Sequence, residues 1–176
     1  MILFEENTRE EQILCVAKAM MTAIRTAPKA KGVDNIETGV ISGITVRRLA
    51  ARMRDIGKEQ GLSFFLRDAE NIENSACVVL VGAKQIDQKL NCGQCGYPTC
   101  QERENTHPTT PCSFIFINQG IAVGSAVSVA ADNRVDCRVM YSAGVAARDL
   151  DLLSNCRNIL AIPLSCSGKS PYFDRK

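Results

Sequence analysis

The chain has 176 residues, 45% of them hydrophobic, and its formal charge of +2 is close to neutral. So small a charge gives no reason to expect nucleic acid or anionic lipid as a partner. The length suits a single domain over residues 1–176, whose core buries roughly 70% of the surface that the unfolded chain exposes.

The first predicted element is an amphipathic helix over about residues 9–26, in which apolar side chains recur every three or four positions. Thr8 and Glu11 have the spacing of a capping box at its start, and Pro28 follows its end. The acidic residues before this helix lack the positive segment and the apolar run of a secretory signal, so we expect a cytoplasmic protein.

A short strand at residues 38–42 leads into a second helix that ends near Gly57 or Gly61. This helix holds the main basic cluster of the chain: Arg47, Arg48, Arg52, Arg54 and Lys58. A solvated outer face explains the cluster, and docking of an acidic electron-transfer partner is the alternative. A helical segment at 67–72 then precedes residues 76–83, where a run of valine and leucine predicts a buried central strand.

A cysteine-rich loop at about residues 84–112 follows this strand. It contains a C-x2-C-x4-C-x11-C array formed by Cys92, Cys95, Cys100 and Cys112. Thiolates are soft ligands that select iron–sulfur clusters, zinc or Cu(I). Gly93 and Gly96 allow tight bends that leave backbone amides free to face inorganic sulfide. The array therefore predicts one [4Fe–4S] cluster with these four cysteines as its ligands.

The array has two other interpretations. A structural zinc site also uses four cysteines, but it usually has two well-separated C-x2-C pairs. A thioredoxin-like redox pair at Cys92 and Cys95 would leave the other two cysteines unexplained. The single histidine, His107, lies inside the loop and is interpreted as a solvent-exposed residue beside Pro108, with a substitute metal ligand as the alternative. No catalytic triad or carboxylate pair predicts hydrolysis.

A long helix is predicted over residues 113–131, and polar residues within it argue against a membrane span. Its middle consists mostly of small residues: Gly120, Ala122, Gly124, Ser125, Ala126, Ser128 and Ala130. Glycine costs about 1 kcal/mol relative to alanine inside a helix, so something must approach this backbone closely. We expect a partner helix from a second subunit, hence a homodimer. A bound planar cofactor is the alternative.

The last predicted elements are a helix over residues 135–153 and a strand over 159–164. In the polar tail, Lys169 and Arg175 are placed where they could bind an anion or simply solvate the end of the chain. Together the elements predict an α+β fold, with a small mixed sheet flanked by helices. Nine cysteines in a reducing compartment are expected as thiols or ligands, and most of the five outside the array as buried side chains.

Three long segments carry a resemblance: NCGQCGYPTC, INQGIAVGSAVSVAADNRVDCRVMYSAGVAA and IPLSCSGKSPYFDRK. They resemble the uncharacterised family of ferredoxin-domain-containing proteins known as DUF2148. The likeness covers nearly the whole chain and includes ENTREEQ and RTAPKAKGVDNIET. It implies the cluster as cofactor but no particular reaction.

A second resemblance is to the nitroreductase-like flavoproteins. The segment from Arg25 to Pro28 looks like the part that meets flavin in those enzymes, and the helix of small residues looks like their dimer-core helix. The resemblance implies a nitroreductase-like fold with an inserted cysteine loop. It also implies an FMN whose phosphate is held by Arg25, Lys29, Lys169 and Arg175. Their N-terminal Arg-x-Ser-x-Arg phosphate motif is not matched by TREEQ.

Three functions follow from these observations. The first is an iron–sulfur protein that passes one electron through a [4Fe–4S] cluster to an unknown redox partner protein. The second is an enzyme, an FMN-dependent reductase in which the cluster is a relay. The third is a non-catalytic module with a structural zinc site. The sequence identifies no electron donor, acceptor or substrate.

Overall fold

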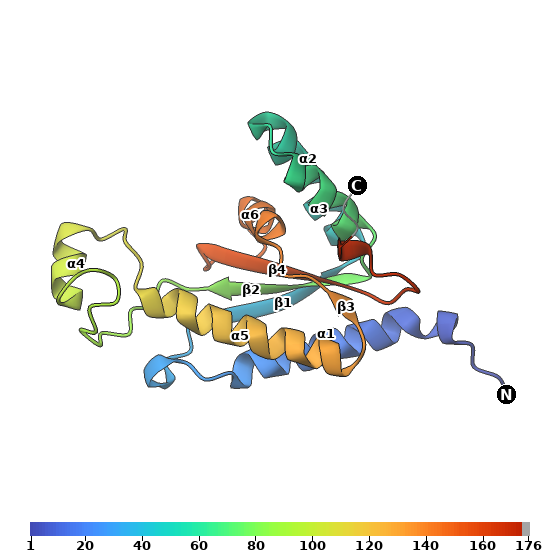
Figure 1. The fold of residues 1–176 in the computed structure, drawn as a ribbon, viewed down its shortest axis with the longest axis horizontal. Helices are drawn as coiled ribbons and strands as arrows, with labels where there is room; N and C mark the ends of the chain where they lie inside the picture. Colours follow the sequence, from blue (N-terminus) through green and yellow to red (C-terminus); the bar gives the residue numbers. More distant parts are fainter. Residues whose placement is uncertain (174–176) are drawn as a thin grey trace.

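The computed structural model describes residues 1–173, and in them an antiparallel sheet of four strands carries helices on both faces (Figure 1). In chain order the elements are η1 (Glu5–Asn7), α1 (Arg9–Thr26), η2 (Ala30–Gly32), β1 (Ile36–Ser42), α2 (Ile44–Gln60), α3 (Ser63–Glu73), β2 (Cys77–Ala83), α4 (Cys100–Thr106), α5 (Ser113–Asp132), β3 (Asp136–Cys137), α6 (Tyr141–Asp149), β4 (Asn158–Ser165) and η3 (Pro171–Phe173). The η segments are short 3-10 turns. The α+β class predicted from the sequence is confirmed.

The strands lie in the order β1-β2-β4-β3, and every neighbouring pair is antiparallel. The prediction of a mixed sheet was wrong in this respect. A single crossover helix between neighbouring strands would give a parallel pair. Here two helices, α2 and α3, connect β1 to β2, so the chain returns in the opposite direction.

The central strand β2 is buried along its whole length, as its apolar run predicted. Its side chains alternate between two cores because successive residues of a strand point to opposite faces. Val79 and Val81 pack with α1 and α5 on one face, while Val78 and Leu80 pack with α2, α3 and α6 on the other. Figure 1 shows these two layers of helices on either side of the sheet.

Helix α1 has the bounds that its periodicity predicted, but the capping box at its start was wrong. The side chain of Thr8 caps no helical amide and instead donates a hydrogen bond to the carbonyl oxygen of Glu5, at 3.2 Å. The cause is the 3-10 turn η1 directly before the helix, which gives Thr8 a helical rather than an extended backbone.

The helix predicted over residues 135–153 was also wrong. The chain first forms β3, which pairs with the end of β4, and Met140 then bridges to Ala161. Only Tyr141–Asp149 is helical. Pairing with a buried strand outweighs the local preference for a helix, which is weak compared with tertiary contacts.

Candidate metal centre

The loop over residues 84–112 connects the end of β2 to the start of α5, and it projects beyond the sheet at that end (Figure 1). Two helices begin at its cysteines. Cys100 is the first residue of the short helix α4, and Cys112 is the N-cap residue of α5. The N-terminus of a helix carries partial positive charge, so the 20-residue α5 favours a negatively charged group beside Cys112.

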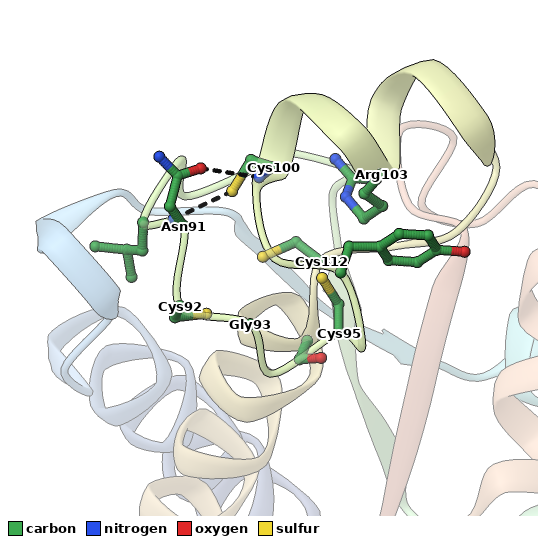
Figure 2. A pocket seen from close by; sticks show the side chains of 10 residues that line it. Asn91, Cys92, Gly93, Cys95, Cys100, Arg103 and Cys112 are labelled. Atoms are coloured by element: carbon green, nitrogen blue, oxygen red, sulfur yellow. Dashed lines mark hydrogen bonds between the residues drawn. The ribbon is translucent and has the colours of Figure 1, made fainter.

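All four array cysteines surround one hollow (Figure 2). Their sulfur atoms face this hollow, which is open to solvent on one side. Cys112 is the most buried, at 7% exposure, whereas Cys92 lies at the surface. The sequence thus brings to one place thiols that are as many as twenty positions apart.

The bends of the loop need backbone conformations that glycine adopts easily. Gly93 and Gly96 have φ of 72° and 89°, in the left-handed region. Asn91 also lies there, with φ of 49°, and asparagine tolerates this region better than most residues. These turns fold the first half of the array around the hollow.

The sequence predicted no role for Asn91, which forms two hydrogen bonds with Cys100, one of the array cysteines. Its backbone N–H donates to the sulfur of Cys100 at 3.3 Å, and its side-chain oxygen accepts from the backbone N–H of Cys100 at 2.8 Å (Figure 2). Hydrogen bonds to thiolate sulfurs are one of the factors that set the potential of an iron–sulfur centre. The feature of the sequence that could have indicated this role is an asparagine directly before Cys92, since asparagine tolerates a left-handed backbone conformation.

A buried arginine was missed as well. Arg103 lines the hollow, is only 3% exposed, and pairs with Asp87. On the outside of the loop Lys89 pairs with Glu104, and this hydrogen bond lowers the pKa of Glu104 and raises that of Lys89. His107 is exposed and is absent from the lining of the hollow; its ring lies 5.7 Å from that of Tyr97.

Buried amide side chains fix the start of α5 to the rest of the molecule. Asn118 donates to the side chain of Asn35 at 2.8 Å and accepts from the backbone of Ala30 at 3.0 Å. One residue further, Gln119 donates to the carbonyl oxygen of Val81 at 2.8 Å. Cys112 lies less than two helical turns from these two residues. The bonds therefore fix the position of Cys112 with respect to the start of β1 and the end of β2.

Of the four residues predicted to bind an FMN phosphate, the three that the structure describes do not meet in one chain. Arg25 pairs with Asp34, and Lys29 donates to the last carbonyls of α1 at 2.6 and 2.7 Å. Lys169 lies near the other end of α1, since its neighbours Ser167 and Pro171 line a hollow together with Arg9. Arg175 lies outside the described residues.

The outer face of α5 is apolar and uncovered in the single chain. Phe116 and Ile121 are 45% and 42% exposed, and a methyl group added at Gly120 or Gly124 would meet nothing within 4 Å. By length and composition α5 could cross a membrane. Its inner face, however, packs on α1 and β2 in the way of a core helix.

Comparison with known proteins identifies the family. The chain is 39% identical to an uncharacterized protein from Archaeoglobus fulgidus over 99% of its own length and 98% of that protein's. The profile of the family described as uncharacterized proteins containing a ferredoxin domain, DUF2148, matches residues 109–175. The chain belongs to this family. Membership indicates an iron–sulfur redox role, although the matched segment includes only Cys112 of the array.

Solved structures show which fold this family member has. An FMN-dependent nitroreductase from Mycobacterium smegmatis, in complex with NADPH, superposes with a TM-score of 0.60 at 12% identity, covering 90% of this chain and 81% of that one. A nitroreductase from Lactococcus lactis in complex with nicotinic acid gives 0.58 at 11% identity, covering 98% and 86%. The nitroreductase-like fold expected from the sequence is therefore confirmed.

Proposed function

We propose that this protein is an iron–sulfur redox protein that carries one [4Fe–4S] cluster for electron transfer. The observation that supports this most strongly is the arrangement of the four array cysteines around one hollow at the start of α5. Cys92, Cys95, Cys100 and Cys112 would hold the cluster. When bound, a cluster with four thiolate ligands accepts and donates one electron without binding substrate.

The residues around the hollow suit a negatively charged group with sulfur ligands. The start of α5 contributes partial positive charge, Arg103 places a guanidinium paired with Asp87 beside the hollow, and Asn91 donates an N–H to sulfur. Among residues 1–173, no acidic side chain lines the hollow. The loop therefore offers thiolates together with the positive charge and donors that stabilise them.

The C-x2-C-x4-C-x11-C sequence spacing favours a cluster over a single zinc ion, because a structural zinc site usually has two well-separated C-x2-C pairs. In a cluster each thiolate binds a different iron, so its ligands stand farther apart around a shared centre.

The test is the metal content of anaerobically purified protein. We expect about four irons per chain, with acid-labile sulfide and a broad visible absorption that bleaches with dithionite. The protein is expressed in medium with ample iron and an equal concentration of zinc, so that both metals are available to the site. Stoichiometric zinc without labile sulfide would show that the structural zinc module is correct instead.

A second candidate is an FMN-dependent reductase with the cluster as a relay, and the fold favours it, since one of the similar structures is FMN-dependent. In this proposal the phosphate lies near Arg25 and Lys29 of one subunit and the tail, with Lys169 and Arg175, of another. Arg25 would then exchange Asp34 for the phosphate.

Titrating the flavin-free protein, with its cluster intact, with FMN and following the quenching of flavin fluorescence tests this candidate. Saturable binding at micromolar FMN, weakened in Arg25→Ala, is the expected result if the reductase is correct. Arg157→Ala, at an exposed position outside these residues, serves as the control. Absence of saturable binding to a protein with its cluster intact would leave the electron-transfer protein alone.

We propose further that the protein is a homodimer formed through the outer face of α5. The uncovered stripe of Gly120, Ile121 and Gly124 supports this, because glycines in a helix are otherwise costly. Gly124→Leu is expected to weaken the dimer by about 1 to 3 kcal/mol while leaving the fold of each subunit unchanged, since the site is open within one chain. Light scattering across a dilution series measures this. A stable monomer of the unmodified protein at micromolar concentration would contradict it.

A further inference from the structure

Arg103 lies on the same face of α4 as an array cysteine. It follows Cys100 by three positions, and residues three apart on a helix are neighbours. Together with all four thiols it lines the hollow (Figure 2). At 3% exposure it is the one buried arginine among residues 1–173, in a loop whose other charged side chains reach solvent.

The guanidinium of Arg103 joins the two ends of the loop. It pairs with the carboxylate of Asp87, in the segment that leads to Cys92, and donates to the carbonyl oxygen of Thr110, just before Cys112. Glu104 lies 3.5 Å away but also pairs with Lys89 at the surface. One buried side chain thus connects the segments that carry the first, third and last cysteines of the array.

We infer that Arg103 positions the cluster loop and that its charge stabilises the reduced state of the centre. This inference rests on the proposed function. Reduction by a one-electron donor adds one negative charge to the site. A buried cation at the rim of the site offsets that charge more strongly than one in water would. The potential of the centre should therefore be higher than without it.

An arginine suits both roles better than a lysine. Its planar guanidinium has five N–H groups, so it can bond Asp87 and Thr110 at once, whereas an ammonium is a compact point charge. Arg103→Lys therefore keeps the charge but loses the connection between the two segments. Arg103→Met loses both, at similar side-chain length.

The experiment uses the iron-loaded protein and measures two quantities, the rate of iron loss to a chelator and the midpoint potential. Arg103→Met is expected to lose iron about 10-fold faster or more, and its potential is expected to fall. Arg103→Lys should lose iron faster with little change in potential. Lys84→Met removes a positive charge from the start of the same loop, where Lys84 pairs with Glu37 at 3.2 Å, and should change neither quantity much.

Asp87→Asn provides a second variant in case Arg103→Met does not fold. It removes a negative charge and weakens the same connection, so iron loss should be faster while the potential rises, opposite to Arg103→Met. Unchanged iron retention and potential in a folded Arg103→Met or Asp87→Asn protein would overturn the role of Arg103 and leave the cluster itself untouched. An unmodified protein without iron would overturn the proposed function as well.

Discussion

Alanine at any one of the four array cysteines is expected to remove the cluster or degrade it to a smaller one. Each thiol borders the hollow. None of the other described side chains that line it could replace a thiolate, since they are apolar or poor metal ligands and Arg103 is a cation. Cys112→Ala should show the largest loss because this thiol is buried and lies at the start of α5. Iron and labile sulfide per chain, with the visible spectrum, measure the result.

The matched control is Cys15→Ala, which changes an exposed thiol of α1 and should leave iron content unchanged. Two buried cysteines outside the array are also not expected to bind the metal. Burial raises the pKa of Cys77 and Cys156 to about 11, so both stay protonated near neutral pH and are unsuited to metal binding. Iron retention that depended on Cys137 or Cys166 as strongly as on Cys112 would contradict the ligand assignment.

The cysteines of the candidate site could be predicted from the sequence because ligand spacing is a local property. Their surroundings could not. Asn91 matters through a reciprocal pair of hydrogen bonds to a residue nine positions away, and Arg103 through contacts with both ends of a long loop. Such roles depend on how the loop closes, and nothing in the periodicity or composition of the chain encodes that closure.

The fold shows the same division between local and tertiary information. The bounds of α1 were predictable, and the end of α2 was predicted near Gly57 or Gly61, of which Gly61 is the left-handed cap, because apolar periodicity and a left-handed glycine act within one turn. The segment after α5 was not, since β3 exists only through its pairing with Leu164 and Ser165 of β4. The antiparallel direction of β2 relative to β1 likewise could not be predicted. It depends on α3 being long enough to pack against α2 as a second connecting helix.

Gly144→Ala is expected to destabilise the fold by about 3 kcal/mol, the upper part of the range for overpacking. A β-carbon at this position of α6 would lie 1.8 Å from the carbonyl oxygen of Ile159, far inside any permitted contact. The helix packs directly on the backbone of β4 here, so it must shift away from the sheet. Urea denaturation, followed by circular dichroism, measures the change in the free energy of unfolding.

Two further variants identify the cause. Gly39→Ala places the same methyl group in β1, where its nearest neighbour is a side-chain carbon of Leu153 at 3.9 Å, so stability should be unchanged or slightly higher. Adding Ile159→Ala to Gly144→Ala should restore nothing, because the obstructing atom belongs to the backbone of β4 and remains when the side chain is shortened. Recovery of stability in that double variant would mean that α6 contacts β4 through side chains, and the close backbone approach would then be wrong.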